Sequence, residues 1–147
     1  MTFLLKKYWL STLVLLIILV LCFMKTTSFP APPVRNFDKL VHTIMFLGLA
    51  GVIFFDNTRY LRFPISKVRI FWSTFIFPIA LGGLIEILQA NLTTYRSGDW
   101  SDFLFDVVGA LIGWGIASLI NHYLVSLRKT RINNRHNTSD KKDKHNC

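Results

Sequence analysis

The sequence is poor in charged residues and in cysteine. Asp, Glu, Lys and Arg together make up 17% of its 147 residues, whereas 52% are hydrophobic and the mean hydropathy is +0.41. Soluble domains carry about 25% charged residues, so this composition excludes an ordinary soluble domain and indicates a membrane protein. The two cysteines, Cys22 and Cys147, are too far apart in the expected topology for a disulfide, and their spacing excludes the cysteine-based metal sites.

The familiar motifs of catalysis and transport are also missing. The chain contains no P-loop, no HExxH pair and no nucleophile elbow, and it shows no internal repeat of the kind found in secondary transporters. No function can therefore be assigned from a single motif. Function has to be inferred from where the few polar residues lie.

Four apolar runs are long enough, or nearly so, to cross a bilayer. They cover roughly residues 4–24, 40–55, 68–89 and 103–127, and a span needs about 20 residues. We expect the short second run to recruit Phe37 and Asp38 as its cap, and Pro78 to kink the third by clashing with the carbonyl of Thr74. The prediction is an all-α integral membrane four-helix bundle formed by residues 1–127.

The first run has an alternative interpretation as a secretory signal peptide, with Lys6 and Lys7 as its basic region. The residues that follow the run contain no small-x-small pair directly after the core and are crowded with proline. An uncleaved span is therefore favoured. The later topology is the same in both interpretations.

The basic residues predict the orientation of the bundle. Lys and Arg favour cytoplasmic loops, and a cytoplasmic N-terminus places thirteen of the seventeen on that side. Residues 128–147 are polar and hold seven of these thirteen, so we expect a disordered basic tail that attracts anionic lipid head groups. The N- and C-termini are thus both predicted to be cytoplasmic. Nucleic-acid binding by the tail has no support in the sequence.

The acidic residues are few and unevenly placed. Six of the eight lie between residues 38 and 106, and two of these, Glu86 and Asp106, are embedded in apolar runs. A charged side chain costs about 2.5–3.5 kcal/mol at the centre of a span on insertion scales. Such groups face a protein interior or a polar cavity, which makes them candidates for function.

The expected topology brings polar residues of three spans to the same outer end. Helical spacing places Asp38 with His42, Glu86 with Gln89, and Asp102 with Asp106 on one face of each helix. Gly109 and Gly113 follow on the face of Asp106 in a small-xxx-small pattern that permits close helix packing. We predict a polar pocket in the outer leaflet with eight ligand-binding residues: Asp38, Lys39, His42, Glu86, Gln89, Arg96, Asp102 and Asp106.

Most of these polar residues also have a purely structural interpretation. Asp99 can cap the last span and Asp102 can stabilise its N-terminal dipole. His42 can bond a backbone carbonyl, and Glu86 can pair with Arg96. Asp38 and Lys39 can anchor a helix at the interface. Their occurrence together at one end of the bundle favours a functional pocket.

Several short motifs follow one another in a fixed order. They are Asp38-Lys39-x-x-His42-x-x-x-Phe46, Glu86-x-x-Gln89, Arg96, and Asp99-Trp-Ser-Asp102-x-x-x-Asp106-x-x-Gly109-x-x-x-Gly113. Over roughly residues 36–120 the chain thus resembles the VanZ-like family of bacterial integral membrane proteins, named for a protein associated with low-level teicoplanin resistance. The resemblance implies a multi-pass protein of the bacterial plasma membrane with a similar helical layout. Many members have Asn at the position of Asp106, so this chain adds an acid there.

The first functional hypothesis is an envelope protein that binds or modulates a lipid-linked component, such as a cell-wall precursor or a polyprenyl carrier. Lys39 and Arg96 would contact the phosphate of this component, and the planar guanidinium of Arg96 would bind it through paired N–H groups. Glu86, Gln89 and the aspartates would accept hydrogen bonds from sugar hydroxyls. Teicoplanin carries a fatty chain that favours the membrane. We therefore expect such a protein to affect glycopeptide susceptibility at the outer surface of the plasma membrane.

The second hypothesis is an intramembrane hydrolase or phosphotransferase acting on a lipid phosphate. Its catalytic residues would be His42, Glu86, Asp102 and Asp106, and this ligand set suits Mg²⁺ or Mn²⁺. A small transporter is the third hypothesis, although four spans are few for one. Binding ranks above catalysis here, and the sequence leaves the cofactor, the metal and the oligomeric state open.

Overall fold

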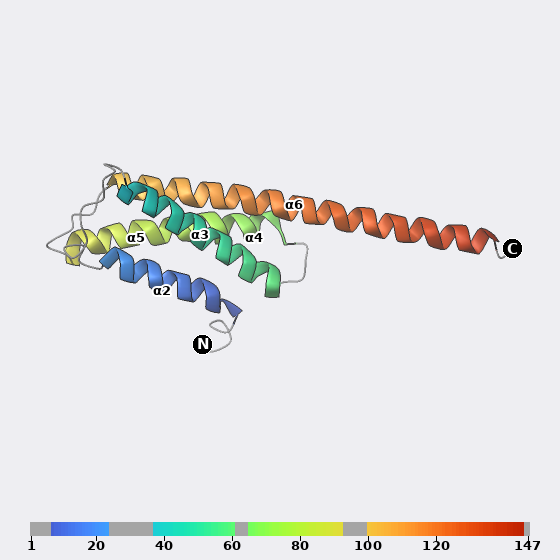
Figure 1. The fold of residues 1–147 in the computed structure, drawn as a ribbon, viewed down its shortest axis with the longest axis horizontal. Helices are drawn as coiled ribbons and strands as arrows, with labels where there is room; N and C mark the ends of the chain where they lie inside the picture. The colour runs from blue at the N-terminus through green and yellow to red at the C-terminus, as the bar shows by residue number, and fades with distance from the viewer. Residues whose placement is uncertain (1–6, 24–36, 61–64, 93–99, 146–147) are drawn as a thin grey trace.

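The computed structural model describes residues 7–23, 37–60, 65–92 and 100–145, and every regular element within them is a helix. In chain order these elements are α2 (Trp9–Phe23), α3 (Phe37–Tyr60), α4 (Lys67–Phe71), η2 (Trp72–Ile76), α5 (Phe77–Leu92) and α6 (Trp100–His145). Because α4, η2 and α5 follow one another without a break, the six elements form four rods, which lie side by side (Figure 1). The predicted all-α bundle is confirmed.

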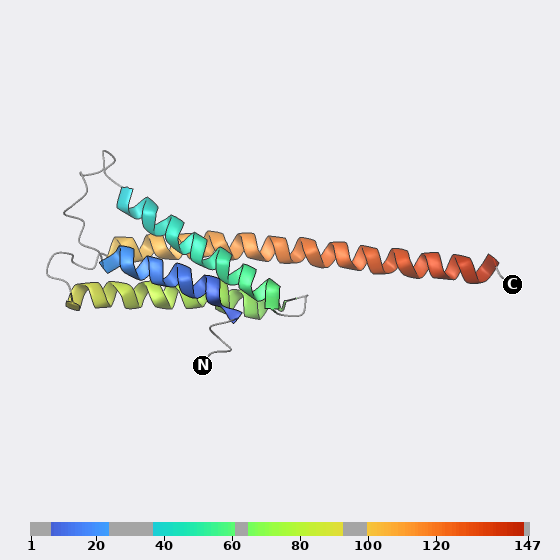
Figure 2. The same ribbon diagram turned by 60° about the horizontal axis from the view of Figure 1, so that its bottom comes forward.

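The four rods alternate in direction, as both ribbon views show (Figures 1 and 2). We call the end where α3 and α6 begin and α2 and α5 stop the Phe37 end. The opposite end, where α2 and α4 begin and α3 stops, is the Tyr60 end. Residues far apart in the chain therefore return to the same end of the bundle.

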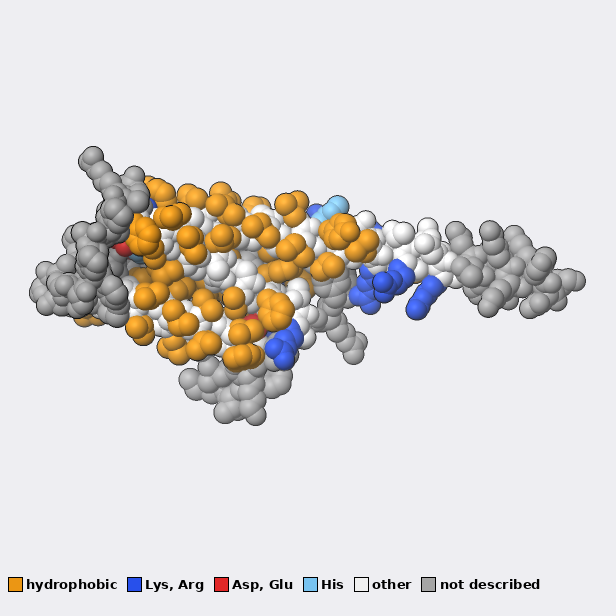
Figure 3. Space-filling model, viewed as in Figure 1, with side chains coloured by type: hydrophobic (Ala, Val, Ile, Leu, Met, Phe, Trp, Pro, Cys, Tyr) orange, Lys and Arg blue, Asp and Glu red, His pale blue; other side chains and the backbone are white. Residues whose placement is uncertain are grey.

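Three helical stretches are long and apolar enough to cross a membrane: Phe37–Arg59, Lys67–Leu92 and Trp100–Arg135. The apolar helix Trp9–Phe23 has 15 residues, fewer than the about 20 of a full span. The first predicted run also includes residues outside the described part of the chain. Large hydrophobic side chains cover the outside of the bundle (Figure 3), as expected for helices surrounded by lipid.

The pairing of α3 with α6 depends on small residues. A β-carbon added at Gly109 would overlap the carbonyl oxygen of Thr43, and one added at Gly113 would lie 2.5 Å from the β-carbon of Ala50. The Thr43 hydroxyl also reaches across to the carbonyl of Phe105 at 3.3 Å. The small-xxx-small pattern thus brings α3 and α6 together, as the sequence predicted.

The third rod contains a π-helical segment in the region where the sequence predicted a kink. Pro78 has no N–H to donate to the carbonyl of Thr74, and the residues just before it, Trp72–Ile76, form a π-helix. Phe77 closes this segment by donating its N–H to the carbonyl of Trp72. The proline is therefore accommodated by a local π segment, a common cause of irregularity in helices.

The last helix is much longer than predicted. We expected a disordered tail from residue 128, whereas α6 continues as helix to His145. The chain contains no Gly or Pro after Gly115 that would end a helix. This segment projects beyond the other rods (Figure 1), and its described side chains from Arg128 to Arg135 are exposed.

Candidate functional site

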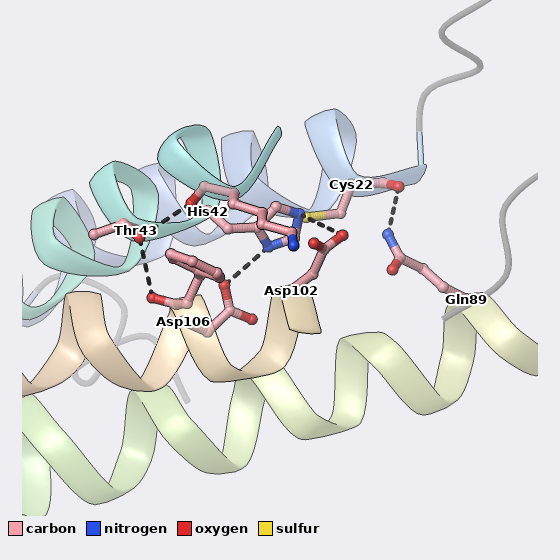
Figure 4. A network of polar contacts seen from close by, with 8 residues as sticks. Cys22, His42, Thr43, Gln89, Asp102 and Asp106 are labelled. Carbon is pink, nitrogen blue, oxygen red and sulfur yellow. Dashed lines mark hydrogen bonds and ion pairs between the residues drawn. The ribbon is translucent and has the colours of Figure 1, made fainter. Parts of the chain in front are cut away.

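The centre of the Phe37 end is a buried ion pair between α3 and α6. Nδ1 of His42 lies 2.9 Å from Oδ1 of Asp106 (Figure 4). His42 is 2% exposed and Asp106 is completely buried. Nδ1 of His42 thus bonds a carboxylate sixty-four residues away in the chain, and not the backbone carbonyl of the structural interpretation.

A second acid approaches the other side of the same imidazole. Nε2 of His42 lies 3.9 Å from Oδ2 of Asp102, one helical turn before Asp106 on α6. Asp102 also lies in the first turn of α6, where its charge favours the helix dipole. Figure 4 shows the imidazole with an aspartate on each side. Asp102 therefore lies at the N-terminal dipole of α6 and also approaches His42, and its ligand-binding role stays a prediction.

Asp38 continues the cluster toward the end of the bundle. It is exposed, one helical turn before His42, and its carboxylate comes within 4.8 Å of ligand atoms of His42 and Asp102. The acids therefore form a graded series that runs from exposed Asp38 through Asp102 to buried Asp106. This series connects the buried pair to the surface of the Phe37 end.

Glu86 joins the cluster from α5. It is 7% exposed, and one of its oxygens lies within 4.8 Å of ligand atoms of both His42 and Asp106. Glu86 also lines a cavity of about 130 Å³ together with Gly83, Ile87, Ala90 and Trp100. The buried cluster therefore borders a small space beside an exposed tryptophan.

Gly82 of α5 leaves space for the side chain of Asp106 on α6. A β-carbon at Gly82 would lie 2.8 Å from Oδ2 of Asp106 and 3.2 Å from the ring of Phe46. This oxygen is buried and has no hydrogen-bond partner among the described residues. Because buried polar atoms are nearly always satisfied, Oδ2 of Asp106 is a candidate ligand atom.

Gln89 makes a contact that was not predicted from the sequence, and its predicted ligand contact stays a prediction. Its Nε2 donates to the carbonyl oxygen of Cys22 at 2.7 Å, which satisfies a carbonyl at the end of α2 (Figure 4). Gln89 is 2% exposed. It therefore connects α5 to α2 at the margin of the cluster.

Of the two predicted cations, Lys39 lies over an aromatic ring and Arg96 lies outside the described residues. Nζ of Lys39 lies 5.6 Å from the centroid of the Phe105 ring, a cation–π distance, so the half-buried lysine lies over the aromatic face of α6. Arg96 and Asp99 fall in residues 93–99, which the structure does not describe. The proposed pairing of Glu86 with Arg96 therefore stays a prediction.

Two sets of three residues have metal-ligand spacing. One is Asp38, His42 and Asp102, and the other is His42, Glu86 and Asp106, with the ligand atoms of each set within 4.8 Å of one another. All three residues of the second set are buried. Oxygen ligands with a single imidazole fit a hard or intermediate divalent cation such as Mn²⁺ or Mg²⁺ better than a thiolate-selective metal.

A second buried polar group, which was not predicted from the sequence, lies at the Tyr60 end. Asp56 is fully buried, and its Oδ2 accepts from the backbone N–H of Ser11 at 3.0 Å and from its hydroxyl at 2.7 Å. Ser11 lies near the start of α2, where backbone N–H groups have no partner within the helix. Asp56 thus caps α2 from a neighbouring helix. The available signal was an acid directly after the apolar run 40–55.

The fold and the cluster define a class: a helical membrane protein with a buried acid–histidine cluster at one end of its bundle. Residues 3–121 match the VanZ/LLP1 family. The chain therefore belongs to this family, and the resemblance noted in the sequence is confirmed. The match contains every residue of the cluster and stops at Asn121, the last buried position among the side chains of α6 that the structure describes. No curated protein and no solved structure matches the chain.

Proposed function

We propose that this chain is a cell-envelope protein of the bacterial plasma membrane that binds the head group of a lipid-linked envelope component. The binding residues are those of the cluster at the Phe37 end, placed in the outer leaflet by the predicted orientation. The observation that carries the proposal is the buried His42–Asp106 pair at 2.9 Å, with Glu86 and Asp102 beside it. Ionisable groups of three helices come together inside membrane-spanning segments. Placing such a group there costs free energy, so groups of this kind usually mark a functional site.

The charges indicate which part of a head group each residue takes. Carboxylates accept hydrogen bonds, so Asp38, Asp102 and Glu86 are suited to sugar hydroxyls and amino groups. Lys39 supplies a cation at the margin of the cluster, and its phosphate partner would lie near the Phe105 ring. Arg96, outside the described residues, is proposed as the second phosphate contact.

The cavity beside Glu86 supports binding from the side of the bundle. Its volume of about 130 Å³ accommodates only part of a ligand. Trp100, which is 77% exposed, lines it and offers an apolar face next to the buried carboxylate. A lipid-linked sugar has both chemical parts, with a polar ring for Glu86 and an apolar chain for the lipid-facing surface.

The test is ligand retention by the purified protein in lipid nanodiscs, measured by native mass spectrometry. The probe is a bacterial polyprenyl phosphate, with and without an attached sugar. We expect one bound ligand, and a roughly tenfold weaker affinity in His42→Gln and Glu86→Gln, because a hydrogen bond to a charged group contributes about 1.5–3 kcal/mol. Asp56→Asn, a buried acid at the other end, is the matched control and should bind normally.

Equal affinity in all four proteins would contradict the proposal, as would the absence of any bound probe. The cellular counterpart is teicoplanin susceptibility in cells that express the protein. We expect expression to lower susceptibility and His42→Gln to remove this effect at the same protein level. Binding without any change in susceptibility would limit the proposal to the lipid ligand.

A second candidate function is a metal-assisted hydrolase or phosphotransferase acting on a lipid phosphate. The specific observation in its favour is the buried set of His42, Glu86 and Asp106 within 4.8 Å, together with the unpartnered Oδ2 of Asp106. These residues would hold Mg²⁺ or Mn²⁺, which when bound neutralises charge on a phosphate. Asp102, beside Nε2 of His42, would hold that imidazole in position.

Metal binding is measurable without any activity. We expect purified protein to bind one Mn²⁺, seen by electron paramagnetic resonance, and Asp106→Asn and Glu86→Gln to lose it while Asp56→Asn retains it. Release of phosphate from a polyprenyl phosphate or diphosphate, lost in the same two variants, would then favour the enzyme over the binding protein. Unchanged Mn²⁺ signals in these variants would exclude this ligand set.

A further inference from the structure

A larger cavity lies at the Tyr60 end, away from the acid–histidine cluster. It lies between α2, α3 and the stretch from Ser66 to Phe77, and its volume is about 750 Å³. Ligand sites in proteins typically measure about 300–1,000 Å³. The cavity shares no residue with the cluster at the Phe37 end, so it requires a separate explanation.

One wall of the cavity carries hydroxyl groups held by buried partners. The Tyr8 hydroxyl donates to Oδ1 of Asn57 at 3.0 Å, and Nδ2 of Asn57 donates to the Ser73 hydroxyl at 2.9 Å. The Ser11 hydroxyl donates to Asp56 at 2.7 Å. Asn57 is 1% exposed and Asp56 is fully buried. The wall is therefore fixed by polar residues behind it, and Oδ1 of Asp56 has no hydrogen-bond partner among the described residues.

The remaining wall is apolar and adjoins the lipid-facing surface. Leu15 of α2, Leu49 and Ile53 of α3, and Phe77 of α5 line it. Trp72, also at the cavity, is 60% exposed. An apolar chain entering between α2 and the third rod would thus contact hydrocarbon-like side chains along its length.

Basic residues lie at the cavity and near it in the chain. Arg69 lines the cavity and is exposed, and Lys67, two residues earlier in α4, is also exposed. Nζ of Lys7 lies 5.3 Å from the centroid of the Tyr8 ring, a ring that also lines the cavity. Among the Lys and Arg side chains that the structure describes, Lys39 alone belongs to the Phe37 end, and Figure 3 shows the visible ones at the Tyr60 end and along α6.

We propose that this cavity binds one anionic phospholipid of the leaflet at the Tyr60 end. One acyl chain packs against the apolar wall formed by Leu15, Leu49 and Ile53. The phosphate of the same lipid contacts Arg69. A guanidinium binds phosphate through paired N–H groups, and basic residues at a membrane surface attract anionic lipids. The hydroxyls of Ser11 and Ser73 are within the same cavity and suit the glycerol and ester oxygens.

A phospholipid fits better than a soluble anion or an uncharged hydrocarbon chain. A soluble anion would leave the apolar wall without a partner, and an uncharged chain would leave Arg69 without one. The phospholipid satisfies both from the side of the bilayer. This site does not depend on the function proposed for the Phe37 end.

The experiment compares two lipids in one membrane. Protein from nanodiscs of equal phosphatidylglycerol and phosphatidylcholine is released into the gas phase, and the retained lipid is identified by native mass spectrometry. We expect one phosphatidylglycerol per protein, and a roughly tenfold loss in Arg69→Ala, as for one charge-assisted contact. Arg131→Ala, an exposed arginine on the projecting part of α6, is the matched control. Leu15→Trp, which fills part of the cavity beside the apolar wall, should also abolish lipid retention.

Location is tested with phosphatidylglycerol that carries a photoactivatable acyl chain. We expect labelled peptides from residues 8–15 and 66–77, and normal labelling in the control Arg131→Ala. Equal retention of both lipids, or unchanged retention in Arg69→Ala, would overturn the proposal. Labels spread over the outer face of α6 around Ile112 and Ile116 would mean ordinary bilayer contact and would overturn it too. Circular dichroism shows whether each variant is folded.

Discussion

Gly109 of α6 lies against the backbone carbonyl oxygen of Thr43 on α3, so closely that a β-carbon at Gly109 would overlap that oxygen. This contact sets the separation of the two helices that carry His42 and Asp106. The imidazole and the carboxylate reach 2.9 Å because their backbones approach each other one turn away.

Gly109→Ala should therefore destabilise the bundle by about 1–3 kcal/mol, the typical cost of overpacking. The measurement is the free energy of unfolding in detergent, followed by circular dichroism during titration with dodecyl sulfate. Gly115→Ala on the same helix is the control, because a β-carbon there meets nothing within 4 Å. A control that is as unstable as Gly109→Ala would show that the contact with Thr43 is not the cause.

His42→Ala should destabilise the protein by about 3 kcal/mol or more, because it leaves the carboxylate of Asp106 buried without its partner. Adding Asp106→Asn should recover part of this loss, since the neutral amide is less costly to bury. The coupling is measured by a double-mutant cycle of unfolding free energies. Additive effects of the two changes would mean that the two side chains do not interact.

Asp56→Ala should loosen the first turns of α2. Its carboxylate accepts from the N–H and the hydroxyl of Ser11, and loss of such a cap costs about 0.5–2 kcal/mol. Hydrogen exchange of the α2 amides reports this directly, and we expect it to accelerate near Ser11. Asp38→Ala, which removes an exposed acid at the Phe37 end, should leave α2 exchange unchanged; a similar acceleration there would contradict a local cap.

The projecting part of α6 should be separable from the bundle. A chain ended at Leu127 should lose the helical circular dichroism of residues 128–145 and keep its unfolding transition, because the family match ends at residue 121. Arg131→Pro should lower the helical signal of the full chain without affecting the bundle. A truncated chain with the same total helical signal would instead support the disordered tail that the sequence predicted.

The predicted orientation can be measured with membrane-impermeant thiol reagents on intact cells. Arg135→Cys should be protected and Asp38→Cys should react, each in a chain carrying Cys147→Ser. Cys22 needs no replacement because it is 2% exposed. The reverse pattern would place the acid–histidine cluster on the cytoplasmic side and remove the outer-leaflet ligand from the proposed function.

The sequence predicted the cluster well because two simple regularities apply to it. Helical spacing of four places Asp102 and Asp106 on one face, and alternation of the rods returns α3 and α6 to the same end. Both rules depend only on residue number and on the count of spans. They required no knowledge of which helices are neighbours.

The partners of Asp56 and Gln89 could not be predicted in this way. Asp56 bonds Ser11, forty-five residues away, and Gln89 bonds the carbonyl of Cys22, sixty-seven residues away. These contacts depend on which side of the bundle α2 occupies, and an apolar helix gives little indication of that. Neither the contact of Gln89 with Cys22 nor the polar group at the Tyr60 end could therefore be predicted from the sequence.

The position of α2 has a consequence for any event that separates this helix from the rest of the chain. Its start is bonded to Asp56 and its last turn to Gln89, while Ile18 and Cys22 pack against Phe46 between them. Detaching it would expose an uncompensated carboxylate and an amide to hydrocarbon at opposite depths of the membrane simultaneously. Proteolysis after this segment would thus leave its product bound in place, as a non-covalent subunit.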